Sequence, residues 1–323
     1  MKIKSAWIVL AITLLIVLPT RIYQVLFLVE PGTGFYTDGN TTTLIISACL
    51  IAGILLMAAF AFADKEKRSY RPIHSLPTAV IGALTGLGLI FQNLISLLGT
   101  QEQENRLSVI LVGVFGILAG AVFILTAYNF AMGQNTFEKH PLLSLIPSLW
   151  GCVSLVTRFI TYISVVNVSE NIYDTFTVIF SLLFLFAQAK MLAGIETEKS
   201  VKQIYTFGIP AILMTLVTGV PSAVVLFSGE AHTGSFPAGL QLVNILMALY
   251  ILAFLSAVWR LPAAEQAQQE ENQSGNSPDG TYISEKIALF EDSDSGERQC
   301  IEFLRGAYSS EEKFAQREKS PFQ

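Results

Sequence analysis

Residues 41–63 of the chain read TTTLIISACLIAGILLMAAFAFA, a stretch without a single charged side chain. A helix rises about 1.5 Å per residue, so a helix of this length crosses a hydrocarbon core roughly 30 Å thick. A strand of a membrane barrel would alternate between apolar and polar residues, whereas this stretch is continuously apolar. The segment therefore predicts a transmembrane helix.

Further blocks of similar length and composition lie on both sides of this segment. With it, they predict transmembrane helices at about 6–28, 41–63, 76–98, 107–130, 142–165, 174–194, 206–228 and 239–259. Of the 323 residues, 52% are hydrophobic and 14% are charged, whereas a soluble globular domain carries roughly 25% charged residues. We therefore expect an all-α polytopic integral membrane protein with eight transmembrane helices and the lipid bilayer as its main partner.

Positively charged residues of the short loops lie almost entirely on one side of the predicted bundle. That side carries Lys2, Lys4, Lys65, Lys67, Arg68, Arg71, Lys139, Lys199, Lys202 and Arg260. The other side carries Arg106 alone. Because cytoplasmic loops retain Lys and Arg, this asymmetry predicts an N-in/C-in protein of the cell membrane, with both termini cytoplasmic.

The first predicted span also has features of a secretory signal peptide, because Lys2 and Lys4 precede an apolar run. No small-x-small cleavage site follows that run, and residues 18–21 (Leu-Pro-Thr-Arg) fit such a site poorly. We therefore expect the segment to remain as the first span. Its removal would leave seven spans and the same cytoplasmic tail.

The end of the chain differs in composition from the rest. Residues 261–323 hold 13 acidic and 6 basic residues, a net charge of −7, whereas residues 1–260 hold 12 acidic and 14 basic residues, a net charge of +2. Gln, Glu, Ser, Asn and Gly dominate residues 263–280, which is typical of a flexible linker. We expect an acidic, largely flexible cytoplasmic tail that could bind a cytoplasmic protein. Nothing in the charge distribution indicates nucleic-acid binding.

Two parts of the membrane region share a sparse pattern of residues. Arg21 precedes Tyr36 by fifteen residues, and Arg158 precedes Tyr173 by the same distance. Four spans lie in each half, so the pattern predicts a 4+4 parallel internal repeat. Chance matches are frequent among apolar segments, and coincidence is the alternative. The predicted regions are membrane half one at 1–130, membrane half two at 131–260 and the tail at 261–323.

Arg21 and Arg158 stand within the first and fifth predicted spans, roughly 5–6 Å beyond their midpoints. A charge at such depth costs roughly 2.5–3.5 kcal/mol on insertion scales, so these residues usually face a bundle interior or a wet cavity. Polar residues recur beside both arginines at helical spacing. The expected ligand-binding residues are Arg21, Gln24, Thr157, Arg158, Thr161 and Tyr162.

Further polar residues at similar depth in other spans would complete an outward-facing vestibule. They are Gln92, Asn93, Gln241 and Asn244. The planar guanidinium fork suits a small anionic ligand with a carboxylate or phosphate group. A structural role is the competing interpretation, in which each arginine pairs with a carboxylate of the following outer loop. The candidate partners are Glu30 or Asp38 for Arg21, and Glu170 or Asp174 for Arg158.

No pattern in the sequence indicates catalysis, a metal or a cofactor. The HExxH, CxxC, GxSxG and Walker patterns are absent, and His74, His140 and His232 lie far apart in loops or at span ends. The leading hypothesis is therefore a transporter or permease-like protein with an outward-facing polar site near the membrane arginines. The alternative is a non-transporting sensor or interaction protein that acts through its cytoplasmic tail. A membrane enzyme is the least favoured class.

Overall fold

The computed structural model describes residues 2–29, 36–63, 72–99, 106–162, 168–228 and 238–260, all of them within the unit Met1–Ala264. Their long helices are α1 (Lys2–Phe27), α2 (Thr41–Phe62), α3 (Leu76–Leu98), α4 (Arg106–Met132), α5 (Pro141–Tyr162), α6 (Val168–Leu192), α7 (Thr197–Ser228) and α8 (Ala238–Trp259). A short 3-10 turn, η2 (Thr136–Glu138), joins α4 to α5. Within these ranges, eight helices are long and apolar enough to cross a membrane. For the described residues, the predictions of helical structure and of eight apolar helices of membrane-spanning length are confirmed.

Several helices are longer than the apolar blocks that predicted them. The seventh predicted span begins at residue 206, whereas α7 begins at Thr197, and the sixth begins at 174, whereas α6 begins at Val168. The fifth was predicted to reach 165; α5 is described as far as Tyr162, and residues 163–165 lie outside the described ranges. Hydropathy identifies only the apolar part of a helix, which can lie in lipid. The helical hydrogen bonds can continue into the polar sequence on either side, so the helix can be longer than the apolar block.

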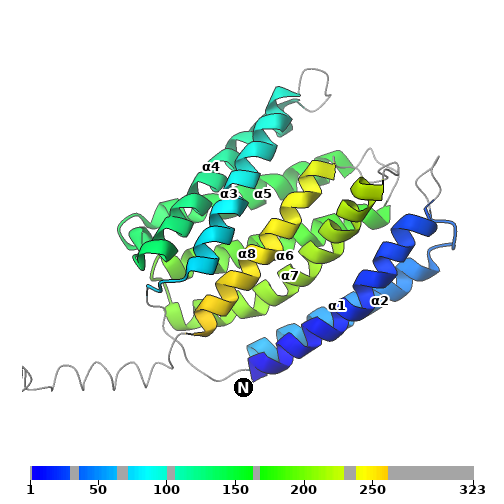
Figure 1. Cartoon of the computed structure of the whole chain (residues 1–323), viewed down its shortest axis with the longest axis horizontal. Helices are drawn as coiled ribbons and strands as arrows, with labels where there is room; N and C mark the ends of the chain where they lie inside the picture. Colours follow the sequence, from blue (N-terminus) through cyan, green and yellow to red (C-terminus); the bar gives the residue numbers. More distant parts are fainter. Residues whose placement is uncertain are drawn as a thin grey trace, which may run out of the picture. The chain divides into compact units, whose positions relative to one another are not determined.

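Helices α3 to α8 close into a ring. Each packs on the next along the chain, and α3 also packs on α8. Helices α1 and α2 form a hairpin that packs on α7, and Figure 1 shows this hairpin in blue beside α7 at the edge of the bundle. Helix α7 therefore contacts four helices, and a larger share of it is buried than of any other described span.

Helices α3 and α4 approach closely at a pair of glycines. A Cβ atom built on Gly86 would lie 2.6 Å from the carbonyl oxygen of Gly120, and one built on Gly120 would lie 2.7 Å from the carbonyl oxygen of Gly86. Neither backbone could keep its position if the other residue had a side chain. Without a hydrophobic force between helices in lipid, such close backbone packing supplies much of their attraction.

One end of the ring is filled by aromatic side chains. These belong to the C-terminal halves of α4, α6 and α8, and all are buried: Phe123, Phe130, Phe184, Tyr250 and Phe254. The rings of Phe123 and Tyr250 meet edge to face with centroids 4.9 Å apart, as do those of Phe184 and Phe254 at 5.7 Å. Phe137 of η2 is fully buried as well. The ring is therefore tightly packed at the end where α4, α6 and α8 finish.

The glycine contact predicts a position-dependent effect of adding one methyl group. Gly86→Ala should destabilise the protein by about 1–3 kcal/mol, because the new Cβ meets backbone that cannot move away. Gly88→Ala is the matched control in the same helix, since its Cβ would meet side chains and no backbone: the flexible end of Leu246 at 2.8 Å and Val243 Cγ2 at 4.0 Å. Thermal unfolding of both variants in the same detergent tests the prediction, and equal losses of melting temperature would contradict it.

Candidate functional site

A cavity of about 100 Å³ lies within the ring, between α3, α4, α5, α6 and α8. Its lining residues come from the middle of the bundle and from the end where α3 and α5 finish and α4, α6 and α8 begin. That end lies opposite the aromatic-filled end. The polar lining residues are Gln92, Asn93, Trp150, Ser154, Thr157, Arg158, Thr177, Ser181 and Asn244. One water molecule occupies about 30 Å³ in the liquid, so the cavity has room for a few waters or one small solute.

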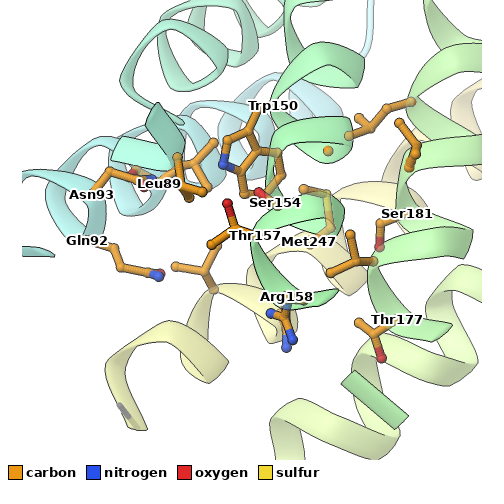
Figure 2. A pocket seen from close by; sticks show the side chains of 17 residues that line it. Leu89, Gln92, Asn93, Trp150, Ser154, Thr157, Arg158, Thr177, Ser181 and Met247 are labelled. Atoms are coloured by element: carbon orange, nitrogen blue, oxygen red, sulfur yellow. The ribbon is translucent and has the colours of Figure 1, made fainter. Parts of the chain in front are cut away.

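Helix α5 supplies one polar stripe along this cavity. Trp150, Ser154, Thr157 and Arg158 follow a spacing of four, seven and eight residues, which places them on one helical face. Figure 2 shows these side chains between Gln92 and Asn93 of α3 on one side and Thr177 and Ser181 of α6 on the other. The opposite face of α5 carries the large apolar side chains Val156, Phe159 and Ile160, each at least half exposed and thus suited to lipid. This division of faces turns the polar stripe toward the cavity.

Three buried polar atoms on the cavity wall have no hydrogen-bond partner among the described residues. They are Gln92 Oε1, Trp150 Nε1 and Ser154 Oγ. An unsatisfied buried polar group costs about 1–3 kcal/mol, so three such groups on one wall are unusual. By contrast, Asn93 Nδ2 on the same wall donates to the carbonyl of Leu89 at 2.7 Å. Unused hydrogen-bonding capacity therefore faces the cavity at three places, while other unsatisfied atoms, such as Ser148 Oγ and Gln188 Oε1, lie away from it.

Arg158 forms an ion pair at the cavity. Its Nη1 lies 3.4 Å from Oδ2 of Asp174 on α6, and the two side chains are 15% and 6% exposed. The pairing that the structural interpretation anticipated for Arg158 is thus confirmed. Arg158 also lines the cavity, so the ion pair places one positive and one negative group beside the unsatisfied polar atoms.

Arg21 lies in a separate polar cluster that joins α1 to α6. Its Nη1 donates to Gln24 Oε1 at 2.7 Å and to the Tyr36 hydroxyl at 3.0 Å, and the guanidinium lies 4.7 Å from the centroid of the Tyr173 ring. Only 2% of Arg21 is exposed. Gln24 in turn donates to Thr43 Oγ1 of α2 at 2.7 Å. This cluster fastens the α1–α2 hairpin to the start of α6.

The structure brings some of the predicted site residues together and separates others. Thr157 and Arg158 line the cavity with Gln92, Asn93 and Asn244, whereas Arg21 and Gln24 are not among its lining residues. The side chains of Thr161, Tyr162 and Gln241 lie outside the described residues. Binding of a ligand by any of these residues remains a prediction.

Trp150, Thr177 and Ser181 line the cavity but were not among the predicted site residues. A signal existed for each of them. Trp150 lies four residues before Ser154 and continues its stripe, and Thr177 and Ser181 are themselves four residues apart on α6. In an apolar segment of sequence, a tryptophan is taken for an ordinary apolar residue. Its polar role becomes visible only when the structure places its N–H group in a polar wall.

The Arg158–Asp174 pair predicts a non-additive effect on stability. Asp174→Asn should destabilise the protein by about 3 kcal/mol, because the charge of Arg158 loses its counter-charge in a site of low dielectric constant. The double variant Arg158→Gln/Asp174→Asn should regain part of that loss. Thermal unfolding of the single and double variants in detergent measures the coupling, and strictly additive losses would contradict it.

No family model, curated protein or solved structure matches the chain. Among the described residues, no three His, Cys, Asp or Glu side chains are placed to hold a metal ion. The cavity, with its ion pair and its unsatisfied polar atoms, is therefore the feature from which a function can be inferred.

Proposed function

We propose that the protein is a membrane transporter or permease-like protein that binds a small polar solute in the cavity beside Arg158. The supporting observation is that Gln92 Oε1, Trp150 Nε1 and Ser154 Oγ all lie unsatisfied on one cavity wall. Lipid offers no hydrogen bonds, so polar groups inside a span are costly unless they serve a ligand or another part of the chain. A bound solute would satisfy all three atoms at once.

The chemistry of the wall favours a solute with both acceptor and donor groups. The Trp150 N–H group can only donate, the Gln92 amide oxygen can only accept, and the Ser154 hydroxyl can do either. A carboxylate on the solute could also exchange with Asp174 for the guanidinium of Arg158, which agrees with the anionic ligand expected from the sequence. With a volume of about 100 Å³, the cavity limits the solute to a few non-hydrogen atoms.

The packing below the cavity fits one closed state of an alternating-access cycle. Leu185 and Met247 belong to the cavity wall, and one helical turn deeper Gln188 Nε2 donates to the Tyr250 hydroxyl. That bond joins α6 to α8 across the ring, with the buried aromatic side chains around it. A solute could leave toward that end only after this bond and the aromatic packing had opened.

The charges of the short loops support a proposal for the orientation of the protein. We propose that both termini are cytoplasmic and that the cavity faces the outside of the cell membrane, because loop Lys and Arg residues collect at the aromatic-filled end.

The 4+4 repeat remains a prediction. In the first half α1 pairs with α2 and α3 with α4, whereas α5 to α8 pack in succession in the second half. The proposed cytoplasmic partner of the tail concerns residues outside the described ranges.

Thiol labelling tests this orientation. On a background without the native cysteines, Gly99→Cys, just after α3, should react with a membrane-impermeant maleimide added to intact cells. Lys139→Cys, just before α5, should react only after the membrane has been opened. Both positions are exposed in the structure, so they differ only in the side of the membrane that they face. The reverse labelling pattern would show that the termini lie outside.

Solute binding is tested by thermal-shift titration of the purified full chain with small carboxylates, amino acids and amides. A ligand should raise the melting temperature of the wild type, and Ser154→Ala should weaken its binding roughly tenfold, the equivalent of one hydrogen bond. Ser148→Ala is the matched control, because this serine is also buried and unsatisfied on α5 but does not line the cavity. Trp150→Phe should weaken binding in the same way as Ser154→Ala.

Uptake of the same ligand into proteoliposomes then separates transport from binding alone. The proposal predicts uptake that is lost in Ser154→Ala and retained in Ser148→Ala. It would be refuted if no small polar solute stabilised the wild type, or if the control variant lost binding to the same degree.

A further inference from the structure

A second hollow lies at the other end of the bundle, between the first turns of α1 and the last turn of α8. Its volume is about 490 Å³, and it is lined by Lys4, Trp7, Ile8, Ser256, Trp259 and Arg260. Helices α1 and α8 both pack on α7, so the hollow lies between two helices that share a neighbour. We call it the α1–α8 groove.

The lining of this groove combines two cations with an apolar and aromatic wall. Lys4 of α1 and Arg260, directly after α8, are exposed, and no carboxylate is among the described lining residues. Trp7 and Trp259 are half-buried, and the Trp259 ring meets Tyr205 edge to face. Indole rings and long basic side chains at the end of transmembrane helices are typical of the level where lipid headgroups meet acyl chains.

We propose that the α1–α8 groove binds an anionic phospholipid. The phosphodiester lies between Lys4 and Arg260, where a guanidinium can donate two parallel hydrogen bonds and an ammonium adds a point charge. The acyl chain lies along Trp7 and Ile8. Basic pockets between transmembrane helices on the cytoplasmic side are a recurrent form of lipid headgroup site.

Such a lipid would complete the attachment of the α1–α2 hairpin. Near the end of α1, the cluster around Arg21 ties the hairpin to α6. At the beginning of α1, the bound headgroup would bridge α1 to α8 through Lys4 and Arg260. This inference shares the proposed orientation but does not depend on solute binding or transport, because the groove and the cavity lie at opposite ends of the bundle.

The acidic tail is the competing occupant. It carries a net charge of −7 and follows directly after Arg260 in the sequence. The lipid is favoured because the groove wall is mainly apolar and aromatic and because lipid surrounds this level of the bundle at high concentration. The experiment therefore has to separate lipid from tail in the full-length chain.

Tryptophan quenching by brominated lipids reports directly on this groove. The chain has three tryptophans, and in the Trp150→Phe background the remaining two, Trp7 and Trp259, both line the groove. The full-length variant is reconstituted in phosphatidylcholine bilayers that contain equal mole fractions of phosphatidylglycerol, with bromine on one lipid or the other. Brominated phosphatidylglycerol should quench more strongly, corresponding to a roughly tenfold preference for the anionic lipid.

Two double variants with the same loss of charge test the assignment to these residues. Lys4→Gln/Arg260→Gln should abolish the preference, whereas Lys139→Gln/Lys199→Gln, at the same end of the bundle but outside the groove, should retain it. The proposal fails if both lipids quench equally, if the groove variant keeps the preference, or if the control variant loses it. It also fails if lipid preference is absent and the groove variant instead makes the tail more sensitive to protease.

Native mass spectrometry of the unmodified chain provides a second readout that needs no variant. Phosphatidylglycerol should remain bound after detergent exchange that strips phosphatidylcholine. Equal retention of the two lipids would overturn the proposal even if the groove variant could not be purified.

Discussion

Every polar group inside a membrane span must find its partner within the protein, because the surrounding lipid offers none. The helices meet this constraint locally where Thr and Ser side chains donate to carbonyl oxygens four residues earlier, as Thr126 does to Val122 at 2.8 Å. They meet it between helices where Thr78 donates to the carbonyl of Ala253 and Tyr205 to that of Leu255. These bonds hold α3 and α7 to α8. The ring exists because its members satisfy one another's polar groups as well as pack together.

The two membrane arginines show two ways in which this constraint is met. Arg158 is neutralised by Asp174, which lies on the neighbouring helix of the ring. Arg21 is held by hydrogen bonds to Gln24 and Tyr36 and by the face of the Tyr173 ring, which attracts a cation electrostatically. Tyr173 and Asp174 are consecutive residues, so the first turns of α6 receive both arginines. Among the described residues, buried polar atoms without a partner also occur elsewhere, at Asn129, Ser148 and Gln188, but on the cavity wall three of them share one hollow that a solute could enter.

The class of fold could be predicted from the sequence, because the requirement for a hydrocarbon-length apolar helix acts on each segment alone. The polar face of α5 and the pairing of Arg158 with Asp174 could also be predicted. Helical spacing determines the first, and the short distance along the sequence between the two residues favours the second. The full set of partners of Arg21 could not be predicted in this way. Arg21 precedes Tyr36 by fifteen residues, and the spacing that suggested a repeat is here a direct contact, but its second aromatic partner, Tyr173, comes from a distant helix. Closure of the ring likewise depends on contacts such as that of Gly86 with Gly120, which no single segment specifies.

The packing of the α1–α2 hairpin on α7 has a consequence for how the chain is made. The hairpin is complete once Phe62 has been synthesised, but its main docking surface does not exist until α7, which begins at Thr197, has entered the membrane. During the intervening synthesis the hairpin lacks this surface, and its contacts with Tyr173 at the start of α6 are the ones that can form earlier. Its outer faces accordingly carry exposed Ile, Leu and Phe side chains that lipid can solvate without any protein neighbour. Docking of α1 and α2 on α7 is thus a late step of biogenesis. These two helices are synthesised first but reach their final position only after α7 has been made.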